Sequence, residues 1–235
     1  MALNKKLKLK TFLVDNIECL RYDGGSGEGL NLPEFELYAR DYLEFAEQEL
    51  ANLSTCGLIN CVSNIKRAMD CQLDTFLSVF NLYKPFKDNN LKIEKKLEFL
   101  QEAGVFNSRS LSRLNNIRNK MEHEYEIPKV QDIELYYDLV VAFVAVLERN
   151  ILILSMHKDM VFMCYDEDDK EIGNFCIGYK YENPLIEISW EKEKESEKLE
   201  VDVSNPYEFA YFLRVYFLMW QLETFASNRF VVSQL

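Results

Sequence analysis

The spacing of apolar residues changes twice along the chain and predicts three regions. Residues 1–30 begin with closely spaced lysines, and residues 11–22 then contain β-forming side chains that predict a strand. Residues 31–156 repeat apolar positions every three or four residues, which is typical of packed helices. Residues 157–235 contain short runs with a period of two, which is typical of antiparallel strands. The expected fold class is α+β, with a helical domain at 31–156 and a strand-rich domain at 157–235.

Five helices are expected in the middle region, at 33–53, 54–81, 91–103, 108–127 and 131–156. Pro33 suits a first helical turn, and the apolar stripe of this helix includes Phe35, Tyr38 and Phe45. Ser54 or Thr55 is the expected cap of the second helix, and Gly104 is the expected stop signal of the third. The fourth helix must end before Pro128, because proline disfavours a helical conformation in the residue before it. The fifth helix is so apolar that we expect burial on most of its sides.

The strand-rich tail is expected to form strands at 160–165, 173–179, 185–190 and 199–203, with a final helix that begins at Pro206. The contiguous acids at 166–169 are interpreted as a solvated turn rather than a metal site. The alternating charges of residues 191–200 indicate a solvated sheet edge. The glycine-rich residues 23–29 lack the Lys-Ser/Thr pair of a phosphate loop, and they are interpreted as a flexible linker.

The charge of the chain limits its function. Lysine and arginine number 27 against 39 acidic residues, and this net charge of -12 argues against a protein that coats nucleic acid through bulk positive charge. Residues 84–120 differ, because they carry nine basic and four acidic side chains. That stretch can attract a polyanion, although scattered surface lysines give the same count.

The cysteines and the apolar runs bear on compartment. Six cysteines without a CxxC pair and only two histidines make a zinc site unexpected, and we expect no metal or cofactor. No secretory signal is apparent, so we expect a reducing, cytoplasmic environment in which the cysteines are buried thiols. The longest apolar run, residues 139–147, is shorter than the roughly 20 residues that span a bilayer, so we expect no membrane association.

One cluster, residues 114–125, contains the residue types of a catalytic site. At about 100° per residue, Leu111, Leu114, Ile117 and Met121 form a core stripe, whereas Asn116, Asn119 and His123 point the opposite way. A lone histidine is usually a satisfied core residue, but this arrangement places His123 away from the core and favours a functional role. Arg118, Glu122 and Tyr125 lie at the border of the core face, where a purely structural Arg118–Glu122 bridge is the alternative.

The arrangement of Arg118, Asn119 and His123 resembles the R-x4-6-H signature of the HEPN superfamily, named for higher eukaryotes and prokaryotes nucleotide-binding. The resemblance covers about residues 33–156 and implies a five-helix bundle. With Tyr125, the pattern R-x4-H-x-Y resembles the toxin of HEPN and minimal nucleotidyltransferase toxin–antitoxin pairs. In that subfamily the tyrosine accepts nucleotide groups from the antitoxin, so the resemblance implies Tyr125 as a modification site and a nucleotidyltransferase as a partner.

The same residues suit RNA cleavage by the 2'-hydroxyl without a metal ion. Histidine titrates near pH ~6.5 and suits proton transfer, so His123 is the expected general acid/base. Arg118 is the expected phosphate clamp, and Asn119 orients the imidazole or the phosphate. Lys120, Asn116 and Arg113 are expected to bind the substrate RNA.

A single straight helix separates Arg118 and His123 by about 140° around its axis, so the two groups do not converge on one phosphate. A two-fold partner can supply the second copy, in agreement with the dimer that the resemblance implies. The alternative is a catalytically inactive HEPN domain that serves as a binding or dimerisation module. The strand-rich tail is a further candidate for partner recognition through its edges.

Overall fold

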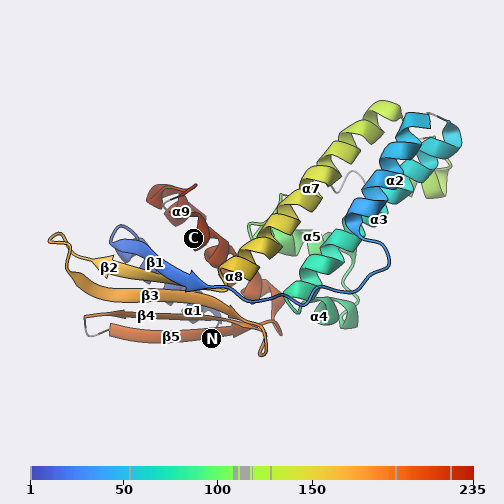
Figure 1. Ribbon diagram of the computed structural model, residues 1–235. Helices are drawn as coiled ribbons and strands as arrows, with labels where there is room; N and C mark the ends of the chain where they lie inside the picture. The colour runs from blue at the N-terminus through green and yellow to red at the C-terminus, as the bar shows by residue number, and fades with distance from the viewer. Residues whose placement is uncertain are drawn as a thin grey trace. The chain divides into compact units, whose positions relative to one another are not determined.

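The computed structural model describes residues 2–52, 54–107, 111, 117, 119–127, 129–193, 195–222 and 224–235. It confirms the α+β class, with helices and one antiparallel sheet (Figure 1). The chain divides into two compact units. The sheet unit comprises Met1–Leu30, Glu102–Gly104 and Leu152–Leu235, and the helical unit comprises Asn31–Gln101 and Val105–Ile151.

The described part of the sheet unit contains five antiparallel strands in the order β1-β2-β3-β4-β5. Their bounds are β1 Leu20–Ser26, β2 Asp159–Tyr165, β3 Glu171–Lys180, β4 Leu185–Lys192 and β5 Glu195–Asp202. The strands expected at 160–165, 173–179 and 185–190 are confirmed. The expected strand at 199–203 begins earlier, so β5 includes part of the charged stretch at 191–200. That stretch does lie at an edge of the sheet, because β5 is the last strand in the order.

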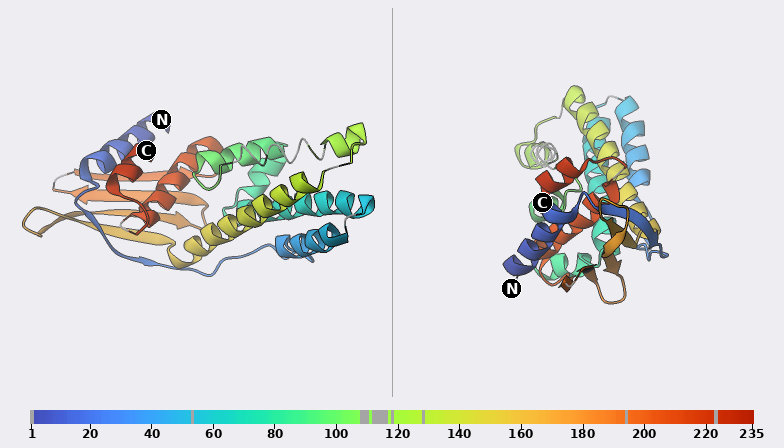
Figure 2. Two further views of the ribbon diagram at one scale, coloured as in Figure 1. Left: turned by 90° about the horizontal axis from the view of Figure 1, so that it is seen from above. Right: turned by 90° about the vertical axis from the view of Figure 1, so that its left-hand side faces the viewer.

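Helices cover one face of this sheet (Figure 2). The sheet unit contains α1 Ala2–Asn16, α8 Pro206–Gln221 and α9 Asn228–Gln234. Phe12 of α1 stacks against Phe175 and Trp190, with ring centroids 5.7 and 4.8 Å away. Phe209 of α8 meets the ring of Tyr179 edge-on at 6.2 Å. These rings are buried, so the aromatic contacts between helices and sheet form the centre of this core.

The opposite face of the sheet carries a chain of ion pairs. Lys180 on β3 contacts Asp159 on β2 at 3.2 Å and Glu187 on β4 at 3.8 Å. Lys198 on β5 contacts Glu187 at 2.7 Å. Pairs of opposite charge on neighbouring strands favour this register over one shifted by a residue. The tail therefore uses its alternating charges to align strands as well as to solvate the edge.

The first thirty residues differ from the prediction. The strand expected at 11–22 is wrong for most of its length, because α1 runs to Asn16. Leu9, Phe12, Leu13 and Ile17 are spaced as on one helix face, and all are at most 8% exposed. Burial of that face against the sheet outweighs the β propensity of Phe12 and Ile17.

The linker expected at 23–29 is also wrong, because β1 extends through Ser26 and pairs with β2. Glycine has a steric reason to be at position 25. A side chain on Gly25 would collide with the backbone carbonyl of Asp159 on β2. The absence of a Cβ therefore allows the two strands to approach closely.

The cysteines also differ from the prediction. Cys19 and Cys164 form a disulfide between the chain just before β1 and the end of β2. Strand pairing explains their proximity, because Leu20 lies opposite Cys164 and the Tyr165 amide donates to the Cys19 carbonyl at 3.0 Å. The other four cysteines are free thiols, and only Cys61 among them is fully buried. The expectation of six buried thiols is therefore wrong, whereas a cytoplasmic location stays a prediction.

In the described part of the helical unit, the helices expected at 33–53, 54–81, 91–103 and 131–156 are present with shifted bounds, and a short helix, α4, was not expected. The expected count of five helices is therefore wrong, and most of the helix expected at 108–127 lies outside the described residues. The bounds of the described helices are α2 Ala39–Asn52, α3 Thr55–Val79, α4 Tyr83–Asp88, α5 Ile93–Glu102, the π-helix η1 Lys120–Glu124 and α7 Val130–Met156. Ser54 caps α3 by accepting a hydrogen bond from the Gly57 amide, as predicted. Gly104, with φ +68°, follows α5, as expected of a stop signal.

The first helix of this unit begins later than predicted and buries another face. It begins at Ala39, and the expected stripe of Phe35, Tyr38 and Phe45 is between 37% and 43% exposed. The buried face instead consists of Ala39, Leu43 and Ala46. Because small side chains allow close packing of helices, alanine positions determine the face that α2 turns towards α3.

The long helix α7 is confirmed, but it is not buried on most sides. Val140, Phe143 and Leu147 are buried at helical spacing, whereas Leu135 is 64% exposed. Among the described residues, α7 is the one helix long and apolar enough to cross a membrane, and 39% of its most apolar stretch is buried. A core helix of a soluble protein meets the same criteria, so the expectation of no membrane association stays a prediction.

Candidate functional site

The predicted site lies where the fourth expected helix ends. Asn119 has helical backbone angles, and the next five residues, Lys120–Glu124, form the π-helix η1. Tyr125 then adopts a left-handed conformation with φ 58°, and its amide donates to the Lys120 carbonyl. The helix therefore ends before Pro128, as predicted. π-turns occur often at functional sites, which agrees with the position of the motif.

The described residues have the exposure that the helical wheel predicts. Leu111 is fully buried, and Ile117 and Met121 are half-buried. Asn119 and His123 are exposed. His123 is therefore not a satisfied core histidine, and its imidazole is accessible to a substrate.

Other residues of the predicted site lie outside the described residues. These are Arg113, Asn116 and Arg118, and the side chain of Glu122 is likewise not described. An Arg118–Glu122 bridge and the distance between Arg118 and His123 therefore stay predictions. Lys120 is exposed, and its Nζ lies 4.0 Å from a carboxylate oxygen of Glu126.

The expected interaction between Asn119 and His123 does not form. No hydrogen bond joins these two described side chains. A π-helix has more residues per turn than an α-helix, so residues four apart no longer lie directly above one another. In this conformation Asn119 does not orient the imidazole.

Tyr125 is not at the border of the core. Its side chain is 87% exposed, because the left-handed backbone turns the chain away from the helix. Tyrosine is bulky, so a positive φ here is unusual and requires that the surrounding structure hold it. The phenol is therefore fully accessible to an enzyme or a partner.

The charge around this site is acidic. Residues 119–138 contain two lysines, Lys120 and Lys129, against six acids at 122, 124, 126, 132, 134 and 138. The cationic stretch at 84–120 is also less available than its count indicates. Lys95 pairs with Glu98 at 2.7 Å, and Lys96 pairs with Asp74 at 2.7 Å. Lys84, Lys87 and Lys92 are exposed, and no ion pair is seen for them among the described residues, so part of the positive charge in the stretch stays available.

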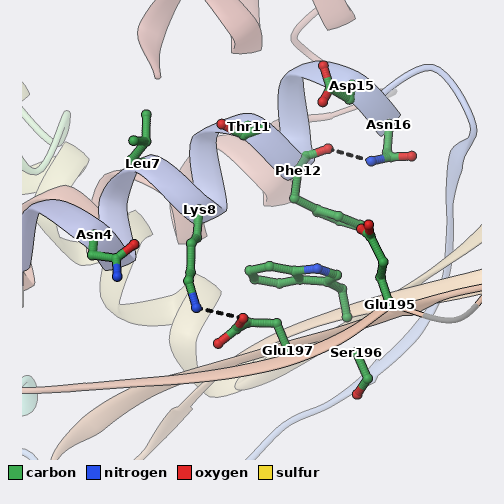
Figure 3. A pocket seen from close by; sticks show the side chains of 11 residues that line it. Asn4, Leu7, Lys8, Thr11, Phe12, Asp15, Asn16, Glu195, Ser196 and Glu197 are labelled. Carbon is green, nitrogen blue, oxygen red and sulfur yellow. Dashed lines mark hydrogen bonds and ion pairs between the residues drawn. The ribbon is translucent and has the colours of Figure 1, made fainter.

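The structure also contains cavities that sequence reasoning missed. A cavity of about 560 Å³ lies between α1 and the β4–β5 end of the sheet (Figure 3). The buried rings of Phe12 and Trp190 line it, and Lys8 bonds to Glu197 at 2.8 Å beside them. A neighbouring cavity of about 690 Å³ shares Phe12 and adds Lys192. The helical spacing of Leu9, Phe12 and Leu13 is the sequence signal that identifies α1, the helix that forms one side of the first cavity.

A third cavity, of about 510 Å³, lies in the helical unit and has an acidic lining that includes Glu34, Glu36, Asp70 and Asp74. The thiol of Cys71 also lines it, and burial raises the pKa of this thiol. A raised pKa keeps the thiol protonated and therefore weakly nucleophilic. None of these three cavities is lined by a residue of the 111–125 segment.

Neither a search for metal ligands nor comparison with known proteins assigns a function to this site. Within the described part of the chain, no three histidine, cysteine or acidic side chains are placed to hold a metal ion. Comparisons with family models, with curated proteins and with solved structures find no match.

Proposed function

We propose that this protein is a metal-independent endoribonuclease of HEPN type that acts as a homodimer. The observation that supports the proposal is the exposed imidazole of His123 at the end of η1, in the sequence pattern R-x4-H-x-Y. A general acid/base has to reach the proton that it transfers, and an exposed histidine meets this requirement. The amide of Asn119 and the ammonium of Lys120 are exposed in the same segment.

The proposed reaction is a transesterification. His123 accepts the proton of a ribose 2'-hydroxyl, whose oxygen attacks the adjacent phosphorus atom. The bond to the 5'-oxygen breaks, and an imidazolium returns a proton to that oxygen, leaving a cyclic 2',3'-phosphate. Arg118 neutralises the charge on the phosphorane, and Lys120 supplies a second cation. A second copy of the chain supplies the second imidazole, so that one histidine accepts a proton while the other donates one.

The test is cleavage of single-stranded RNA in EDTA by wild type, Arg118→Ala and His123→Ala. General acid–base catalysis contributes roughly 100-fold or more, so His123→Ala should lose at least that factor. Arg118→Ala should lose a similar factor, because it removes the cation that stabilises the phosphorane. His157→Asn is the matched control, because His157 is the other histidine of the chain and belongs to the sheet unit. Equal cleavage by wild type and both folded site variants would contradict the assignment.

We also propose Tyr125 as an acceptor of nucleotide groups from a nucleotidyltransferase partner. Its 87% exposure supports this, since the hydroxyl has to enter the active site of another enzyme. Mass spectrometry after co-expression with a nucleotidyltransferase encoded beside this chain should show added nucleotide mass on wild type and none on Tyr125→Phe. Unmodified wild type would remove this part of the proposal.

The second candidate is a catalytically inactive HEPN domain that binds other proteins. The acidic surplus of residues 119–138 favours it, because carboxylates repel RNA phosphates. Expression in a host separates the two functions. A nuclease slows growth in a manner that His123→Ala abolishes, whereas a binding module produces equal growth with either chain. A cytoplasmic location belongs to both proposals.

A further inference from the structure

The segment after His123 exposes an unusual amount of apolar surface. In the described part of the chain, five large apolar side chains are at least 60% exposed, namely Leu7, Tyr125, Ile127, Leu135 and Phe225. Three of the five fall within eleven consecutive residues, 125–135. They occupy the loop after η1 and the second turn of α7. Scattered apolar residues on a surface are ordinary, but three such residues this close together in the sequence make the segment a candidate contact site.

Carboxylates surround these apolar residues. The exposed acids of the segment are Glu124, Glu126, Asp132, Glu134 and Asp138. On α7, Asp132 and Asp138 lie three residues before and after Leu135, on the same side of the helix. Lys129 is the one lysine of the segment, and Lys120, which precedes it, lies 4.0 Å from Glu126. We name the exposed side chains of residues 124–127 and 129–138 the acidic apolar surface.

The charge of the acidic apolar surface limits what can cover it. A second copy using the same surface would bring two sets of carboxylates together, which is destabilising, so the homodimer proposed above has to form through other residues. RNA phosphates and anionic lipid headgroups would meet the same repulsion. A polypeptide with apolar side chains between lysines or arginines satisfies both features, since its apolar groups cover Ile127 and Leu135 while its cations meet the acids.

We propose that the acidic apolar surface binds a basic amphipathic segment of a partner protein. Leu135 is the apolar contact on α7, and the flanking Asp132 and Asp138 pair with cations on the partner. Tyr125, which belongs to the same surface, follows His123 by two residues in the sequence. If the nuclease proposal holds, such a partner can control access to the catalytic histidine, but the binding itself does not depend on nuclease activity.

The probe for this proposal is a dye-labelled, 18-residue amphipathic helical peptide made of lysine and leucine. Its counterpart has glutamate in place of every lysine. Fluorescence anisotropy is measured as the intact chain is added. The lysine peptide should bind at 50 mM salt, and the glutamate peptide should not. Raising the salt to 500 mM should weaken binding of the lysine peptide about tenfold, because exposed charges are screened.

Matched variants locate the contact. Leu135→Ala should weaken binding about tenfold, because it removes most of one buried leucine side chain from the complex. Leu7→Ala is the control, since Leu7 is also a helical leucine, is 62% exposed and belongs to the sheet unit. It should bind as wild type does. Circular dichroism confirms that both variants stay folded.

Two variants of equal net charge distinguish attraction of the peptide to the acidic apolar surface from attraction to the net negative charge of the whole chain. The first variant neutralises three acids around Leu135, namely Asp132→Asn, Glu134→Gln and Asp138→Asn. The second neutralises three exposed acids at the β2–β3 hairpin, namely Glu167→Gln, Asp168→Asn and Glu171→Gln. Both change the net charge by three, and only the first should weaken binding about tenfold at 50 mM salt.

Several results would overturn the proposal. The proposed site is wrong if the chain binds both peptides equally. It is also wrong if the two leucine variants bind the lysine peptide equally, or if the two charge variants do. Light scattering that shows a dimer of the chain alone, dissociated by Leu135→Ala, assigns the surface to a second copy. Retention of the chain on anionic vesicles, lost in Leu135→Ala, assigns it to lipid. His123→Ala should bind the peptide normally, so failure of the nuclease proposal is separable from failure of this one.

Discussion

Replacing Phe12 by alanine tests the main structural difference from the sequence-based expectation. Phe12 belongs to α1 rather than to a strand, and its side chain is 8% exposed. Its ring lies between α1 and the sheet, 4.8 Å from the centre of Trp190 and 5.7 Å from that of Phe175. Alanine keeps the helical propensity of α1 and removes this contact, so the change reports on packing.

The expected loss of stability follows from the area that the ring buries. A buried phenylalanine removes roughly 150 Å² or more of surface from water, which at ~25 cal/mol per Å² corresponds to about 4 kcal/mol. Phe→Ala substitutions in cores cost about 3–5 kcal/mol once the cavity is included. Because Phe12 keeps 8% of its surface exposed, we expect a value at the lower end of this range, about 3 kcal/mol.

The assay is urea unfolding followed by tryptophan fluorescence. Both tryptophans of the chain, Trp190 and Trp220, belong to the sheet unit, so the signal reports that unit. Val14→Ala is the control, because Val14 lies on the same helix and is 43% exposed. Its loss should stay below about 1 kcal/mol. If Phe12→Ala costs no more than Val14→Ala, α1 does not pack as described.

The remaining predictions concern cysteines and one ion pair. Cys19→Ser removes a disulfide that joins residues 145 apart, so it should lower the free energy of unfolding by about 2–5 kcal/mol in non-reducing buffer. In dithiothreitol, where wild type also lacks the disulfide, the two proteins should be equally stable. Equal urea midpoints of wild type and variant in non-reducing buffer would refute the disulfide. Burial raises the pKa of the Cys61 thiol from 9.0 to about 11, so the unfolded chain loses this proton first and stability should fall as pH rises from about 9 towards 11. Iodoacetamide at pH 8 should label exposed Cys56 and leave Cys61 unlabelled; mass mapping that finds both labelled would contradict the burial. The ion pair between Lys8 and Glu197 is partly exposed, so Lys8→Glu should lower the free energy of unfolding by less than about 1 kcal/mol. Adding Glu197→Lys to the same chain should restore the stability. Thermal melts that show no restoration would indicate that the pair contributes nothing.

The predictability of the candidate site was partial for a physical reason. The exposure of Asn119 and His123 followed from helical spacing, which depends only on local geometry. The π-turn at Lys120–Glu124 and the left-handed Tyr125 have no comparable local signal. As a result, the sequence placed Tyr125 at the core border, which was wrong, and it favoured a contact between Asn119 and His123 for which the described side chains show no hydrogen bond.

Packing faces were predicted well only where one face was clearly more apolar than the others. In α3, Leu58, Val62, Ile65 and Met69 are buried at the expected spacing. In α2, aromatic residues drew the prediction to the wrong face, because side-chain size indicates apolar area but not which side approaches a neighbour. The alanines of α2 are buried through close contact with α3, a fact that depends on the partner helix.

The sequence by itself determined the features whose causes lie within a few residues. The Ser54 cap, the stop at Gly104, the turn at residues 166–170 and the helix that begins at Pro206 each depend on neighbouring backbone and side-chain groups. Only the tertiary structure decided that the first residues form a helix, that β1 pairs with β2 and that Cys19 meets Cys164. These features depend on burial and pairing between segments more than a hundred residues apart, and such long-range contacts outweigh local propensity.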